Sequence, residues 1–252
     1  MDLLARKSPL GVRAVATQLG LPLGSVHRLL LDFEEAGIAE RTEAGEWELS
    51  FKLLELTGLQ LERIHFPALA RPFAERIAEA TGETVNINVL SGLHGVSVDK
   101  VRGNEGMQMD MRIGTRGPLH CGGAGKAMLA FLGAADQERV MAGPLDALTP
   151  KSITDPRVLR KELAQIRARG YSIDDQEVVL GVYCVSVPIL DARSRPVGAV
   201  SITGLTPKAP GPAIQPLVDL LNDACSQVSR KLGFRGDYPL GDAVAIQQRA
   251  ES

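Results

Sequence analysis

The segment from Pro118 to Ala127 concentrates the residue types that could do chemistry. It reads PLHCGGAGKA and places a histidine, a thiol and a lysine among three glycines. A glycine-rich turn at the start of a helix exposes backbone N–H groups at the positive end of the helix dipole, which suits a carboxylate. A closely packed turn that needs glycine for space is the alternative, and the sequence leaves both interpretations open.

Two enzymatic interpretations fit this segment poorly. A phosphate-binding loop of the GxxxxGK[ST] type needs glycine where His120 stands and a hydroxyl where Ala127 stands. A cysteine nucleophile needs a nearby base, but Cys121 and His120 are adjacent, and adjacent loop residues seldom point toward each other. We therefore expect no catalytic residue here.

Small polar residues form a second group further along the chain: Asp174, Cys184, Ser201 and Thr203. If the strands that carry Cys184 and Ser201 are neighbours, these side chains converge on one face of a sheet rich in valine and isoleucine. A few convergent polar groups in apolar surroundings are typical of a small-ligand pocket. Hydrogen-bonded polar core residues are the alternative interpretation.

A third pattern, near the N-terminus, predicts DNA binding. Four residues have the spacing of a helix-turn-helix: Ala16, Gly20, Val26 and Leu29. The motif needs a small residue at the helix crossing, a glycine in the turn, and apolar residues on the inner face of the second helix. That second helix most often enters the major groove of DNA.

The helical period places Gly24 and Arg28 opposite the apolar stripe of this second helix, with Ser25 and His27 beside them. Arg28 can donate two hydrogen bonds to a guanine edge, and its neighbours can bond phosphate or base. Residues 38–49 read as a hairpin wing that carries two further phosphate contacts. The expected DNA-binding set is Arg13, Gly24, Ser25, His27, Arg28, Arg41 and Thr42.

Charge and composition limit the function further. The formal net charge of −2 over 252 residues gives no global support for nucleic-acid binding. Residues 1–30 carry four cations against one carboxylate, whereas residues 31–64 carry three cations against nine carboxylates. Because phosphate neutralisation supplies much of the affinity for DNA, the cations must share one face. Three separated cysteines and four scattered histidines favour neither disulfides nor a metal site, so no metal or cofactor is expected.

Periodicity divides the chain into four segments. We expect a winged helix-turn-helix over 1–50, an apolar linker helix over 51–64 that packs against a partner chain, a ligand-binding domain over 65–235, and a flexible tail over 236–252. No apolar run reaches the roughly 18 residues of a membrane span, and the N-terminus does not read as a secretory signal. A cytoplasmic protein with no membrane partner is therefore expected.

The expected elements of the third segment alternate between helices and strands, which predicts an α+β fold with an antiparallel sheet. In chain order they are a helix from 67 to 81, strands at 85–89, 96–101 and 107–113, helices at 126–132 and 155–169, strands at 184–190 and 196–203, and a helix at 213–232.

These pieces, in this order, resemble the IclR family of bacterial transcriptional regulators over residues 3–235. The most specific segments are SVHRLL at 25–30, ATGETVNINVL at 80–90, GPLHCGGAGKAMLAFL at 117–132 and RGYSIDDQEVVLGVYCVSVPILDARSRPVGAVSITG at 169–204. The resemblance implies a winged helix-turn-helix, a GAF-like effector domain, and a homodimer or dimer of dimers on a palindromic double-stranded DNA operator. The chain departs from the family in a short first helix and in the acidic stretch after residue 31.

The resemblance also implies a small-metabolite effector, in many relatives a carboxylic or aromatic acid. Family pockets use a glycine-rich turn, an acidic residue, a cysteine and two hydroxyls, which match Gly123, Ala124, Gly125, Asp174, Cys184, Ser201 and Thr203. We expect a repressor or activator whose operator binding is gated by such an acid. A metabolic enzyme or small-molecule carrier with an accessory helical domain is the alternative, and it predicts turnover that depends on Cys121 or Cys184.

Overall fold

The computed structural model describes residues 1–56, 65–104, 112–205, 214–238 and 240. The chain divides into two compact units, Met1–His65 and Phe66–Ser252, which are described separately below. Within these described ranges, no helix has both the length and the apolar composition that crossing a bilayer requires.

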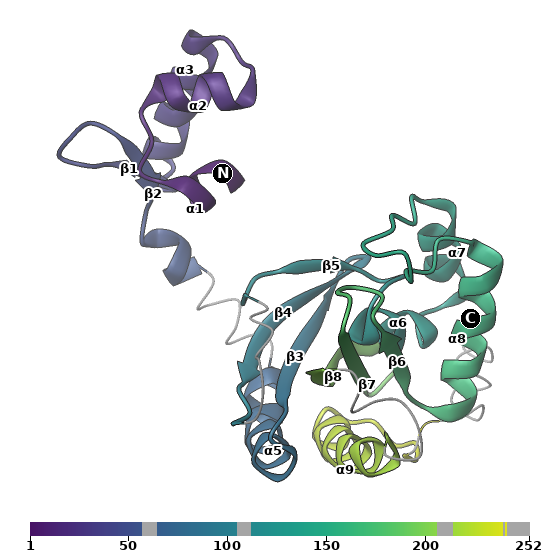
Figure 1. Ribbon diagram of the computed structural model, residues 1–252. Coiled ribbons are helices and arrows are strands. Elements are labelled where there is room, and N and C mark those ends of the chain that lie inside the picture. The colour runs from purple at the N-terminus through teal and green to yellow at the C-terminus, as the bar shows by residue number, and fades with distance from the viewer. Residues whose placement is uncertain (57–64, 105–111, 206–213, 239, 241–252) are drawn as a thin grey trace. The chain divides into compact units, whose positions relative to one another are not determined.

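The N-terminal unit consists of short helices and a two-stranded wing (Figure 1). Its helices are α1 (Asp2–Lys7), α2 (Val12–Leu19) and α3 (Leu23–Glu35), and its antiparallel strands are β1 (Ala39–Arg41) and β2 (Trp47–Leu49). The buried core of this unit is formed by Leu4, Val15, Ala16, Val26, Leu30, Ala39 and Trp47. Residues 52–56 are helical, and the remainder of the predicted linker helix, 57–64, lies outside the described residues.

The predicted helix-turn-helix is present, with one correction. Gly20 ends α2 in the left-handed conformation at φ +64°, and its N–H donates to the carbonyls of Ala16 and Thr17. Leu29, however, is 42% exposed, whereas Leu30 is 2% exposed. Val26 and Leu30 are one helical turn apart and share the inner face, so Leu29 falls outside that face. The prediction of an inward-facing Leu29 is wrong.

A six-stranded antiparallel sheet forms the second unit, in the order β5-β4-β3-β8-β7-β6. The strands are β3 (Thr84–Ser91), β4 (His94–Val101), β5 (Arg116–Pro118), β6 (Ser172–Asp175), β7 (Val182–Leu190) and β8 (Pro196–Leu205). Figure 1 shows two helices along one side of this sheet, α5 (His65–Thr81) and α9 (Gln215–Lys231). On the other side lies α6 (Gly123–Ala130), which packs on α8 (Pro156–Arg169), with α7 (Ala134–Ala142) beside α8.

Three elements of this unit were not predicted, namely β5, β6 and α7. Strands β5 and β6 have three and four residues, so few residues carry their periodicity. Helix α7 buries only Gln137 and Met141, so its sequence shows no clear apolar stripe. The strand predicted over 107–113 lies mostly outside the described residues, and Ile113 stands in a turn with 60% of its surface exposed. Helix α6 begins at Gly123, three residues before the predicted start at Lys126.

The segment predicted as a flexible tail begins with packed residues. The Tyr238 hydroxyl donates to the carbonyl of Pro188 at 2.9 Å and lies 2.9 Å from Ser229 Oγ. Leu240 is 1% exposed and belongs to the core around α6 and α8. The tail prediction is therefore wrong for these two residues, because their side chains fill the edge of the core. Residues 241–252 lie outside the described part of the chain.

The turn glycine of the helix-turn-helix provides a stability test. Gly20→Ala should lower the free energy of unfolding by about 1–2 kcal/mol, because a Cβ strains the left-handed conformation even where the surroundings are open. Gly24→Ala is the matched control, since this glycine lies in α3 in open space and without a positive φ. Urea denaturation of the two variants should separate them, and equal midpoints would contradict the assigned turn.

Candidate functional site

One face of the central sheet is polar although it is buried. Direct cross-strand partners in an antiparallel sheet share a face. The register therefore places two rows on this face, which are Asn86–Ser201–Ser186–Ser172 and Thr84–Thr203–Cys184–Asp174. The alternate residues of the same strands, such as Val85, Val185 and Ile202, point to the opposite face and are fully buried.

Side-chain hydrogen bonds connect the polar rows. Ser186 Oγ donates to Ser201 Oγ at 2.7 Å, and Asn86 Nδ2 donates to Thr203 Oγ1 at 3.0 Å. Thr203 Oγ1 also lies 3.1 Å from Cys184 Sγ. Since Ser201 receives its bond from Ser186, its own O–H remains available to donate to a ligand.

Helix α6 begins against this polar face, and its glycines allow the close approach. A Cβ on Gly123 would lie 2.4 Å from Ser186 Oγ, and a Cβ on Gly125 would lie 2.6 Å from the carbonyl oxygen of Pro118. The interpretation of these glycines as a closely packed turn is therefore correct. A closely packed turn can still bind a carboxylate, because the first N–H groups of a helix have no partner within the helix.

A buried ion pair fixes the position of this turn. Lys126 is 1% exposed, and its Nζ forms an ion pair with Glu177 Oε1 and donates to the carbonyl of Ile173 at 2.7 Å. The other carboxylate oxygen of Glu177 accepts from the Gly122 N–H at 3.2 Å. The Glu177 N–H in turn donates to Asp174 Oδ1 at 2.6 Å. One pair of charges thus connects the start of α6 to the segment that follows β6.

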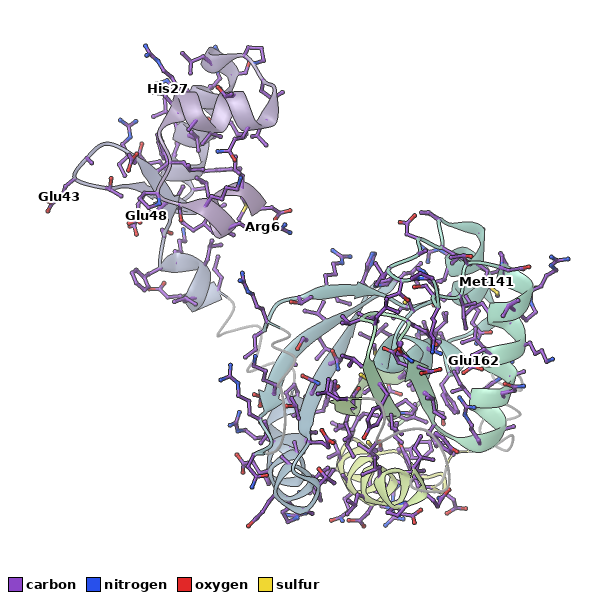
Figure 2. All side chains as sticks on the ribbon, viewed as in Figure 1. Arg6, His27, Glu43, Glu48, Met141 and Glu162 are labelled. Carbon is purple, nitrogen blue, oxygen red and sulfur yellow. The ribbon has the colours of Figure 1, made fainter. Side chains whose placement is uncertain are left out.

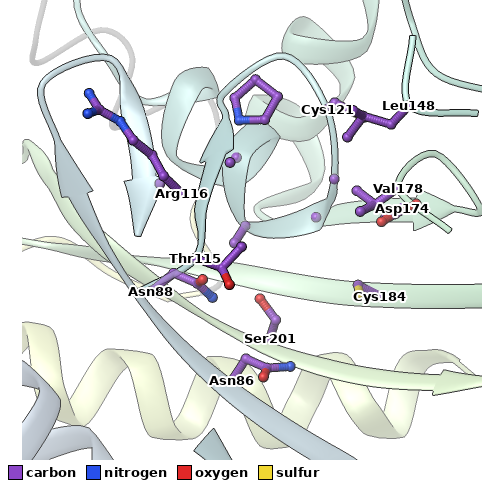
Figure 3. Close-up of a pocket in the computed structure, with 17 residues that line it drawn as sticks. Asn86, Asn88, Thr115, Arg116, Cys121, Leu148, Asp174, Val178, Cys184 and Ser201 are labelled. Carbon is purple, nitrogen blue, oxygen red and sulfur yellow. The ribbon is translucent and has the colours of Figure 1, made fainter. Parts of the chain in front are cut away.

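A cavity of about 240 Å³ lies between the polar face and the start of α6 (Figure 3). It is lined by Asn86, Asn88, Gly95, Thr115, Arg116, Gly117, Pro118, Cys121, Gly122, Gly123, Ala124, Gly125, Leu148, Asp174, Val178, Cys184 and Ser201. Six of the seven predicted effector-binding residues are in this lining. The seventh, Thr203, is not, and its hydroxyl instead contacts Asn86 and Cys184.

Of the eleven lining residues that the sequence analysis did not predict, four carry an amide, hydroxyl or guanidinium group: Asn86, Asn88, Thr115 and Arg116. The two asparagines alternate with valine and isoleucine along β3, a pattern that equally describes a strand with one face in water. Arg116 is exposed, and its Nη2 lies 2.9 Å from His94 Nδ1. The signal for a ligand site that the sequence did offer is the pair of asparagines on one face of β3, whose other face is valine and isoleucine.

Burial determines the charge state of the cavity. It raises the pKa of Asp174 to about 6, and the nearby Glu177 carboxylate contributes to the rise. Burial also raises the pKa of the Cys121 thiol to about 11 and that of Cys184 to about 12, so both are neutral thiols at pH 7.

The side chains of His120 and Cys121 contact different groups. His120 Nε2 lies 3.1 Å from the carbonyl of Asp146. Cys121 Sγ lies 3.4 Å from the carbonyl of Glu177, so its contact is not with the adjacent histidine.

The predicted DNA-contacting residues divide into two groups. Gly24, Ser25, His27 and Arg28 are exposed together on α3, and Arg13 is exposed on α2. Figure 2 shows His27 on α3 and Glu43 at the tip of the wing. The Arg41 guanidinium lies 3.4 Å from a carboxylate oxygen of Glu34 and 4.5 Å from the centre of the Trp47 ring. Thr42 Oγ1 accepts from the Glu46 N–H at 3.2 Å, so both wing residues already have partners within the unit.

Two family models match this chain. The IclR helix-turn-helix domain matches residues 1–43, and the bacterial transcriptional regulator IclR C-terminal domain matches residues 59–230. The chain belongs to the IclR family. Its architecture is accordingly a winged helix-turn-helix combined with a GAF-like α+β effector domain.

Named relatives of this IclR-family chain are regulators. The HTH-type transcriptional regulator BhcR of Paracoccus denitrificans is 31% identical over 245 residues, which cover 96% of this chain and 86% of the relative. The transcriptional repressor IclR of Escherichia coli is 34% identical over 194 residues, which cover 75% and 71% respectively. The protein is therefore a DNA-binding transcriptional regulator and not an enzyme, and the enzyme alternative is set aside.

Solved structures agree with the fold. The Thermotoga maritima IclR structure has a TM-score of 0.74 at 32% sequence identity and covers 92% of this chain and 95% of that one. An IclR homologue from Microbacterium hydrocarbonoxydans, complexed with 4-hydroxybenzoate, has a TM-score of 0.76 at 24% identity, with 88% and 91% coverage. At that identity the second likeness shows the fold alone.

The close approach of α6 to β5 provides a test of the cavity wall. Gly125→Ala should lower the free energy of unfolding by about 1–3 kcal/mol, because the new Cβ would overlap backbone atoms of Pro118 and Leu119. Gly24→Ala, within α3 with no atom within 4 Å and no positive φ, is the control and should not lower stability, because alanine is the better helix former. Chemical denaturation measures both, and equal effects would contradict the packing described.

Proposed function

We propose that a small organic acid binds in the cavity and controls operator binding by the winged helix-turn-helix. The observation that carries this proposal is the set of hydrogen-bond donors that line this one cavity. These are the Ser201 hydroxyl, the first N–H groups of α6 and the exposed guanidinium of Arg116. Such donors favour an anion over a cation or a neutral apolar ligand. The proposed contacts of the acid are Gly123, Ala124, Gly125, Asp174, Cys184 and Ser201. Thr203 does not line the cavity, and its hydroxyl contacts Cys184 and Asn86.

The proposed DNA interface is the exposed side of α3. Arg28 would donate to a base edge, with Gly24, Ser25 and His27 close to the backbone and Arg13 on a phosphate. A phosphate contact by Arg41 would require exchange of its Glu34 partner, so Arg41 and Thr42 are secondary members of the set. The acidic residues of α3 do not oppose this arrangement, because Asp32, Glu34 and Glu35 lie near its C-terminal end and its first nine residues contain no carboxylate.

Two copies of the chain on a palindromic operator complete the proposal. The residues that enter the linker are unusually apolar for an exposed surface, with Phe51 76%, Leu54 65% and Leu56 47% exposed. Burial of such a surface against a second chain would form a homodimer or part of a dimer of dimers. Acid binding would then alter the spacing of paired α3 helices, and such coupling is typically worth about 1–3 kcal/mol. The prediction that the protein represses or activates transcription, and the prediction that it is cytoplasmic, stay predictions.

Loss of the base contact should weaken operator binding selectively. Arg28→Ala should reduce affinity for the promoter region beside the chain's own gene by about 1–3 kcal/mol and relax preference at one base pair. Arg13→Ala should instead weaken binding to specific and unrelated duplexes alike, because a phosphate contact carries no sequence information. Fluorescence anisotropy with both duplexes makes the comparison. Unchanged operator affinity in Arg28→Ala would remove Arg28 from the interface.

Binding of the acid should depend on pH through Asp174. An ionised Asp174 repels a bound carboxylate, whereas a protonated one can donate to it. Because burial raises the pKa of Asp174 to about 6, the Kd of the acid should increase by up to about tenfold per pH unit above 6. Isothermal titration between pH 5.5 and 8 measures this slope. Asp174→Asn should flatten it, and a slope that persists in this variant would assign the proton to another group.

A further inference from the structure

We propose that the effector is an aliphatic hydroxy acid rather than an aromatic acid, and that Asn86 and Asn88 bind its hydroxyl group. This inference rests on the proposed function, since it assumes that the cavity holds an acid. It adds a second point of recognition, on the β3 side of the cavity. The glycine-rich turn would hold the carboxylate, and the asparagines would discriminate between acids.

Asn86 lines the cavity and has a buried side-chain oxygen without a hydrogen-bond partner among the described residues. The residue is 2% exposed and its Nδ2 donates to Thr203 Oγ1, but its Oδ1 accepts no hydrogen bond from the residues that the structure describes. A buried amide oxygen without a partner carries a free-energy cost that a ligand group can remove. Asn86 lines the cavity, so a bound molecule is the natural partner.

A hydroxyl group suits this position better than any other ligand group. The two ends of an amide have nearly the same shape, so either can face Thr203 and leave the other free. A free oxygen needs a donor and a free nitrogen needs an acceptor. A hydroxyl is both, so it satisfies Asn86 in either orientation.

Further polar groups surround the same region. Figure 3 shows the Asn88 amide and the hydroxyls of Thr115 and Ser201 directed toward one part of the cavity. Asn88 is 7% exposed and lies two residues from Asn86 on the same face of β3. Ser201 is the direct cross-strand partner of Asn86 and has a proton to donate. A ligand hydroxyl there would find donors and acceptors together.

The walls of the cavity argue against an aromatic ring. The larger apolar side chains that line it are Pro118, Leu148 and Val178, and no phenylalanine, tyrosine or tryptophan stands among the described lining residues. A ring placed against β3 would therefore gain no aromatic stacking there. An aromatic acid without a hydroxyl group would also leave the amide groups without partners. The same argument disfavours unsubstituted fatty acids.

The test compares matched acids on the full-length wild-type protein by isothermal titration. The probes are linear acids of three to six carbons, each with and without one hydroxyl group, together with benzoate and 4-hydroxybenzoate. We expect at least one hydroxy acid to bind about tenfold or more tightly than its deoxy partner, because a site built to bond a hydroxyl rejects the analogue that lacks it. Preferential binding of the deoxy or aromatic acids would overturn the inference.

Variants assign any preference to the asparagines. Asn86→Leu should abolish the advantage of the hydroxy acid while leaving the deoxy acid bound, and Asn88→Ala is a second, smaller change with the same expected direction. Asn222→Leu is the matched control, because Asn222 also has a buried unpartnered Oδ1 but lies on α9 outside the cavity lining. An advantage that survives both cavity changes would refute the role of the asparagines.

Measuring operator affinity in the presence of the same acids distinguishes failure of this inference from failure of the proposed function. If deoxy or aromatic acids bind and alter operator affinity, the inference fails and the proposed function stands. If no acid in the panel binds or alters operator affinity, both fail together. If hydroxy acids alone bind and alter operator affinity, both are supported.

Discussion

The ion pair between Lys126 and Glu177 is the interaction on which the rest of the effector domain depends. It is buried, and it connects helix α6 to the segment after β6 across 51 residues of sequence. Removing Lys126 would leave the buried Glu177 carboxylate without its cation, which is a strongly destabilising change. Lys126 itself has a second carboxylate nearby, because its Nζ lies 3.6 Å from Glu162 Oε1. Glu177 also bonds the Gly122 N–H and Asp174. The same pair therefore positions both the turn and the carboxyl group of the cavity.

The polar face of the sheet shows how the domain combines stability with a ligand site. An apolar face would pack against α6 more simply, as the opposite face does against α9. Here the hydroxyls of Ser186 and Thr203 form hydrogen bonds with side chains on the neighbouring strands. Asn86 Oδ1 has no hydrogen-bond partner among the described residues. Local departures from optimal packing are expected where a protein binds something. The glycines of α6 then bring backbone donors close to this face.

Much of the architecture could be predicted from the sequence because its signals are local. The turn glycine at Gly20, the polar residues Cys184 and Ser201, and the glycines before Lys126 all follow from residue type and spacing. The ion partner of Lys126 could not be predicted, since no local pattern joins it to Glu177. Asn86 was missed for a different reason, because alternating polar residues on a strand also describe a face in water. Only the sheet register resolves that ambiguity.

Hydrogen exchange at the start of α6 tests the central claim most directly. Deuterium uptake of the backbone amides in the peptide that contains Gly123, Ala124 and Gly125 should be followed in the full-length protein, with and without a saturating acid. The account predicts slower exchange at these amides on binding, since the ligand carboxylate would accept their hydrogen bonds. Protection that appears elsewhere and leaves these three amides unchanged would contradict it.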